Sequence, residues 1–182
     1  MTHYGAKELA YSFRQVRGNT VQIANDIPED KYDFKASPES RSIRQTLVHI
    51  ALAPRVQAHV HKNRFTDAGA VPWGQIIQGV AAEEATPRTK AEVIALLTSE
   101  GESFASYLES LTDAFLAESV TMPPPLQPAS KSRFEMLMSP KEHEMHHRGQ
   151  LMMLQRMIGQ VPHLTRQMQE RMAQATAAPA GR

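Results

Sequence analysis

The most informative stretch of this 182-residue sequence is SPKEHEMHHRGQLMMLQRMI, residues 139–158. It is typical of one long helix. Ser139 is expected to be the N-cap, Pro140 to take the first helical position, and Glu142 to complete a capping box. The helix is expected to end at Gly159, because glycine readily adopts the left-handed conformation that often follows a helix.

Two histidines of this predicted helix share a face with apolar residues. Each residue of an α-helix turns by ~100° about the axis, so His147 lies roughly 40° from His143. Both imidazoles are therefore expected to face the core, together with Met157 and Ile158. A histidine pair at positions i and i+4 can chelate one metal ion. His146 lies roughly 60° from His143 on the other side, so geometry alone leaves it as an alternative to His147.

A third ligand is expected from a second helix, which is predicted from about Ser42 to Lys62 with a kink at Pro54. His49 lies on the apolar stripe of this helix, and two ligands are too few for a stable site. Three neutral imidazoles would leave coordination positions open for water or substrate, as in reactive metal sites.

From the residues alone, it remains open that these histidines have a structural role and bind no metal. A single histidine on an apolar face is more often a core residue than a ligand, and HxxxH pairs also occur on solvated helices. His59 and His61 lie off the inner stripe and are expected to be solvated. Neither Glu142 nor Glu144 is predicted to point at the ion, since each lies roughly 100° from His143.

Two further long helices are predicted, one from about Lys7 to Ile27 and one from Thr89 through Leu111. The intervening residues 63–87 are harder to interpret. A turn at 71–74 and a short helix at 75–82 would form either a lid or pocket wall, or a surface loop anchored at the turn.

The fold class predicted from these elements is all-α, an antiparallel four-helix bundle spanning residues 1–162. Residues 122–126 are expected to be an extended connector, and no strand is predicted. Residues 163–182 would form a short C-terminal extension, with a helix at about 165–174 and a frayed tail at 175–182.

Composition narrows the functional classes. The 20 Lys and Arg residues nearly balance 19 Asp and Glu residues, which argues against a nucleic-acid partner. The chain has no cysteine, so thiolate metal sites and cysteine nucleophiles are excluded. Neither a signal peptide nor a membrane span is recognised, and a cytoplasmic protein without a membrane partner is expected.

Two segments together resemble a known family. His143-x-x-x-His147-Arg148-Gly149-Gln150 is similar to the HxxxHRGQ segment of the DinB-like, or YfiT-type, metalloprotein superfamily. Residues 41–50, RSIRQTLVHI, are similar to the family segment that ends in the first histidine ligand. The resemblance covers roughly residues 4–158. It implies a four-helix bundle, usually a homodimer, that binds a divalent ion through His49, His143 and His147, and it favours His147 over His146.

The function expected on this basis is a metal-dependent transferase that activates a low-molecular-weight thiol, as in some relatives of this family. The ion would be zinc, nickel, iron or copper, since three nitrogens suit each of them. The substrate would be a small molecule. Two alternatives remain: a non-catalytic metal-binding stress or accessory module, and a metal-dependent hydrolase.

Overall fold

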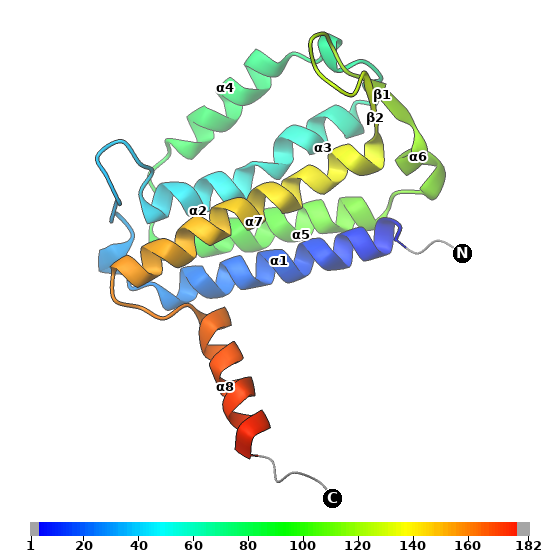
Figure 1. Cartoon of the computed structure of the whole chain (residues 1–182). Helices are drawn as coiled ribbons and strands as arrows, with labels where there is room; N and C mark the ends of the chain where they lie inside the picture. The colour runs from blue at the N-terminus through cyan, green and yellow to red at the C-terminus, as the bar shows by residue number, and fades with distance from the viewer. Residues whose placement is uncertain (1–3, 178–182) are drawn as a thin grey trace, which may run out of the picture.

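The computed structural model describes residues 4–177, and four long helical rods dominate it (Figure 1). They are α1 (Ala6–Asp26), the pair α2 (Ile43–Leu52) and α3 (Pro54–Lys62), α5 (Lys90–Glu109) and α7 (Arg133–Met157). Helix α1 packs against α5 and α7, and α2 packs against the same two helices. In Figure 1 the chain runs in one direction along α1 and α7 and in the opposite direction along α2, α3 and α5. The predicted four-helix bundle is confirmed.

A polar middle layer separates two apolar clusters of the bundle. One cluster takes residues 6–13 of α1 and 104–108 of α5, whereas the other takes residues 23–27 of α1 together with most of α2. Between them lie Arg17 of α1, Gly101 of α5 and Glu144 of α7, all buried. We call these three residues the middle layer.

Helix α7 begins earlier than the sequence predicted, so the predicted start at Ser139 is wrong. The N-cap is Ser132, whose side chain accepts a hydrogen bond from the Glu135 backbone N–H in a capping box. Pro140 lies inside the helix, where it costs one backbone hydrogen bond. The earlier start buries Met136 and Leu137, and this gain in apolar burial explains why the helix continues through the proline.

The second rod follows its prediction more closely. Ser42 caps α2 in a capping box with Gln45, as predicted. The break also falls where it was expected, because α3 starts at Pro54. In the same way, Thr89 caps α5 in a box with Glu92.

The segment between α3 and α5 is more helical than predicted. It contains the 3₁₀ turn η2 (Ala68–Ala70) and the helix α4 (Trp73–Glu84), which packs against α2 and α3. Trp73 anchors the start of α4 by donating its indole N–H to the Ala68 carbonyl, 2.8 Å away. The sequence left open whether this segment is a pocket wall or a loop anchored at the turn at 71–74. The structure shows features of both, since the segment is anchored at this turn and α4 lines a cavity.

The predicted absence of strands is wrong. After the short helix α6 (Asp113–Ala117), strands β1 (Ser119–Thr121) and β2 (Ser130–Ser132) pair antiparallel. Each strand has only three residues, which is too short to give the apolar alternation that identifies a strand in a sequence. A further 3₁₀ turn, η1 (Glu29–Lys31), follows α1.

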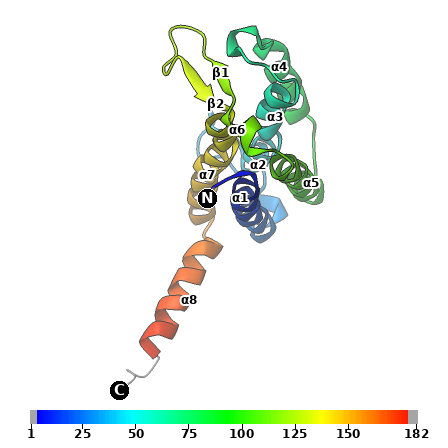
Figure 2. The same ribbon diagram turned by 90° about the vertical axis from the view of Figure 1, so that its right-hand side faces the viewer.

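The C-terminal helix α8 (His163–Ala177) is longer than predicted and projects away from the bundle (Figures 1 and 2). Residues 175–177, expected to be frayed, are helical, while 178–182 lie outside the described residues. The boundary between bundle and extension at residue 162 stays a prediction. Within residues 4–177, no helix combines the length and the hydropathy needed to cross a bilayer.

Three methionines show the limits of helical-wheel reasoning. Met157, predicted to face the core, is 53% exposed, because α7 ends there beyond the packed part of the bundle. The helical wheel places Met145 and Met152 on the outer face of this helix, where apolar residues would favour a homodimer. Met145 is 46% exposed there, whereas Met152 is half-buried against the core. The homodimer stays a prediction.

Candidate metal centre

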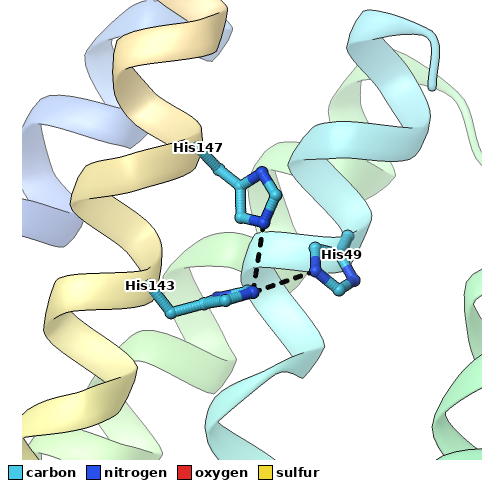
Figure 3. A group of neighbouring side chains, drawn as sticks. All are labelled: His49, His143 and His147. Atoms are coloured by element: carbon cyan, nitrogen blue, oxygen red, sulfur yellow. Dashed lines mark hydrogen bonds between the residues drawn. The ribbon is translucent and has the colours of Figure 1, made fainter. Parts of the chain in front are cut away.

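The structure brings His49, His143 and His147 together between α2 and α7 (Figure 3). The Nε2 atom of His143 lies 3.1 Å from the Nε2 of His49 and 3.1 Å from the Nε2 of His147. Helix α2 supplies the first histidine and α7 the other two, one turn apart. In Figure 3 all three rings point into the space between the two helices.

The outer nitrogens of two rings are held by side chains that accept hydrogen bonds. His49 Nδ1 lies 2.6 Å from Glu84 Oε1 of α4, and His147 Nδ1 lies 2.8 Å from Gln150 Oε1. If each Nδ1 carries the proton, each Nε2 turns a lone pair toward the shared space. Two nitrogens bound to one ion at ~2.1 Å lie roughly 3.0–3.4 Å apart, so the observed spacing fits a metal ion.

Electrostatics favour neutral rings in this cluster. Burial lowers the pKa of His143 to about 4, with further contributions from the charges of His147 and His49. Burial likewise lowers the pKa of His147. Neutral imidazole is the form that binds metal, so neutral pH does not oppose ligation at these two rings.

Glu144 does not reach the cluster, although it lies between the two histidines in the sequence. It is buried on the other side of α7, where its carboxylate pairs with Arg17 at 2.9 Å. Glu142 is exposed on α7. Both findings agree with the prediction that neither carboxylate points at the ion.

Three of the other histidines, His59, His61 and His146, were considered in the sequence analysis. His146 is exposed and lies outside the three-histidine group, with its Nε2 3.1 Å from the Gln150 side-chain nitrogen. His59 is exposed, as predicted. The prediction for His61 is wrong, because this residue is buried and its Nδ1 lies 3.1 Å from Nη1 of the buried Arg133.

Two residues near the cluster were missed by the sequence analysis. Glu84 comes from α4, 35 residues after His49, and only the packing of α4 on α2 brings them together. No local pattern in the sequence signals such a contact. Arg41 immediately precedes the α2 cap in the quoted segment RSIRQTLVHI, but no role was assigned to it.

Two cavities flank the cluster and have Arg41 in common. The first cavity, of about 360 Å³, lies between α4 and the helices α2, α3 and α7, and its lining includes His49, His143 and Glu84. The second cavity, of about 440 Å³, is lined by His147, among others. The cluster is thus reachable from two sides, which a purely structural metal site does not require.

Comparison with known sequences gives one match to a family model. The sequence model described as the DinB superfamily matches residues 12–151. A search of curated proteins found no match.

Solved structures give the same fold. A DinB-like protein of Bacillus subtilis, YjoA, is 23% identical, with a TM-score of 0.62 over 85% of this chain and 94% of the other. YfiT from Bacillus subtilis, described as a probable metal-dependent hydrolase with an unusual four-helix bundle topology, is 16% identical, with a TM-score of 0.68 over 88% and 91%. A DinB-like protein of Bacillus cereus is 16% identical, with a TM-score of 0.64 over 85% and 93%. At these identities the likeness establishes the fold alone.

Proposed function

The chain belongs to the DinB superfamily, and from this premise we propose that it is a metal-dependent transferase acting on a low-molecular-weight thiol. His49, His143 and His147 would hold one divalent transition-metal ion. In the reaction, the thiol sulfur forms a bond to an electrophilic carbon of the second substrate. The leaving group departs with the bonding electron pair, and the thiol proton passes to solvent.

The ligand set is supported by the chemistry of the three rings. Their Nε2 atoms face one another. On the opposite side of the ring, His49 Nδ1 contacts Glu84 and His147 Nδ1 contacts Gln150. Such outer partners fix the tautomer of a ligating histidine and increase its basicity. The family segment in α7 ends in Gln150, and the contact with His147 Nδ1 gives this residue a physical role.

The observation that carries the choice of reaction concerns the carboxylates. Among the described residues, Glu84 is the one carboxylate that lines either cavity, and it is held by His49. Glu144 is held by Arg17. Bound metal lowers the pKa of a thiol and removes the need for a general base. A thiol therefore suits a site in which both nearby carboxylates are already engaged.

Hydrolysis is the second candidate, and one observation favours it. Glu84 lines the first cavity as well as contacting His49, so its carboxylate lies beside the space that a water nucleophile would use. The structural relative YfiT is described as a probable metal-dependent hydrolase. A non-catalytic metal-binding module is the remaining alternative.

Cobalt substitution separates these candidates. The cobalt-loaded protein is titrated with 2-mercaptoethanol, glutathione, bacillithiol and mycothiol, and its visible spectrum is recorded. We expect an intense sulfur-to-cobalt band with at least one thiol, and metal-dependent conjugation of that thiol to an electrophile. The His49→Ala variant should lose both, whereas His146→Ala should keep both. A spectrum unchanged by every thiol would refute thiol transfer, and metal-dependent ester cleavage without thiol would favour hydrolysis.

A further inference from the structure

Arg41 is an exposed, positively charged residue beside the candidate metal centre. It lines both cavities that flank the histidine cluster. Within residues 4–177 its guanidinium makes no hydrogen bond or ion pair. The next two arginines along the chain differ, since Arg44 pairs with Asp33 and Arg55 pairs with Glu100.

The surroundings of Arg41 leave its charge uncompensated. Glu84, the one carboxylate lining the cavities within the described residues, is already engaged by His49. The positive charge therefore favours an anionic group on whatever enters the site.

The first cavity adds an apolar requirement. Apart from the cluster and Arg41, its wall is largely made of small and branched aliphatic side chains, among them Ala53 and Val56 of the second rod and Ile77, Val80 and Ala81 of α4. Ile77 is 55% exposed, so its apolar surface is available to a ligand. A volume of about 360 Å³ is within the range of small-molecule sites.

We infer that Arg41 binds a carboxylate of the small-molecule substrate, whose apolar body lies in the first cavity beside Ile77 and Val80. A single guanidinium fork matches the two oxygens of one carboxylate and balances its single charge. The substrate class is thus an amphiphilic carboxylate of modest size. Its position relative to the reacting atoms rests on the proposed function, but its recognition by Arg41 does not.

Ligand titrations followed by NMR test this recognition directly. Hexanoate and its neutral analogue hexanamide are each titrated into zinc-loaded and metal-free protein. We expect hexanoate to bind about tenfold more tightly than hexanamide in both forms. Arg41→Gln should abolish this preference, and Arg41→Lys should retain part of it, because the charge stays but the fork is lost.

The control is Arg171→Gln, which removes the same charge from the exposed face of α8 and should change nothing. If hexanoate binds Arg41→Gln as tightly as the wild type, the inference is wrong. A preference confined to the zinc-loaded protein and intact in Arg41→Gln would show that the carboxylate binds the metal instead.

Two measurements on Arg41→Gln, its metal content and its binding of an uncharged thiol, test this inference separately from the proposed function. Arg41→Gln should bind a full equivalent of zinc and give the same cobalt spectrum with 2-mercaptoethanol as the wild type. With 3-mercaptopropionate it should bind about tenfold more weakly than the wild type. If no thiol changed the spectrum of the cobalt-loaded protein, the proposed function would be overturned. The hexanoate titration would still decide the role of Arg41.

Discussion

The carboxylate of Glu144 lies 2.9 Å from the guanidinium of Arg17, in an ion pair almost completely removed from solvent. Arg17 also donates hydrogen bonds to the backbone carbonyls of Leu97 and Ile50. One side chain thereby links α1, α2, α5 and α7. Because His143 and His147 flank Glu144 on α7, the pair fixes the rotation of that helix and thus the direction in which both imidazoles point.

Removing this buried charge pair should destabilise the fold strongly. Glu144→Gln leaves the guanidinium of Arg17 buried without its counter-charge. We expect the free energy of unfolding to fall by about 3–5 kcal/mol in urea denaturation. The control is Glu142→Gln, two residues away on the exposed face of the same helix, which should change stability by less than about 0.5 kcal/mol. Equal, small effects of the two substitutions would contradict the structural role of the pair.

Gly101 is required for the same contact. A Cβ atom at this position would lie 2.6 Å from Cγ of Arg17, whose side chain is held by its hydrogen bonds. Gly101→Ala should therefore destabilise the protein, although alanine is the better helix former by about 1 kcal/mol. Gly18→Ala, in α1 with open space around it, should stabilise by up to about 1 kcal/mol. Thermal unfolding of both variants measures this difference in sign, and a stabilised Gly101→Ala protein would contradict it.

The middle layer shows what a sequence can and cannot predict. Periodicity and capping residues located the helices, because these signals are local. The site histidines were found since each lies on a helix stripe that faces the core. Arg17 and Glu144 are charged residues that pair with each other although 127 positions separate them in the sequence. Gly101 lies inside a helix, where glycine alone indicates only a local loss of helix stability. For none of these three residues does the neighbouring sequence indicate which distant residue it contacts.

The contact between Glu84 and His49 was unpredictable for the same reason. It depends on how α4 packs on α2, and the sequence left residues 63–87 open between a pocket wall and a loop. The start of α7 was misplaced for a different reason. Ser132 and Ser139 both begin capping-box patterns, and burial of the residues between them decides the outcome.

Glu84 should strengthen metal binding without being a ligand. Glu84→Ala removes the acceptor for His49 Nδ1, so the ring loses its fixed orientation and some basicity. We expect the zinc affinity to fall about 10- to 100-fold in competition with a chelator. Glu83→Ala, the neighbouring carboxylate that pairs with Arg88, should leave the zinc affinity unchanged. An unaltered affinity in Glu84→Ala would remove the proposed role of this contact.

Acid should destabilise the metal-free protein through its buried histidines. Burial, with the charge of Arg133, lowers the pKa of His61 from 6.5 to about 4. Between pH 6.5 and pH 4, His61 is therefore protonated in the unfolded state but stays largely neutral in the folded state. The contribution of His61 is fully present above pH 6.5 and is lost as the pH falls toward 4, by at most about 1.4 kcal/mol per pH unit.

Urea denaturation of metal-free protein between pH 7 and pH 4.5 measures this loss. His61→Gln should flatten the dependence of the unfolding free energy on pH, because one of the shifted groups is removed. His59→Gln, at an exposed position of the same helix, should leave the dependence unchanged. If His61→Gln and wild type lose stability in parallel, His61 is not among the groups responsible.

Elemental analysis of the purified protein and its histidine variants tests the metal centre most directly. We predict one equivalent of a divalent transition metal per chain in the wild type and in His146→Ala. His49→Ala, His143→Ala and His147→Ala should each lose most of it, while circular dichroism shows that they remain folded. Full metal content in His147→Ala together with loss in His146→Ala would show that the wrong ligand was assigned, and full metal content in all four variants would contradict the site altogether.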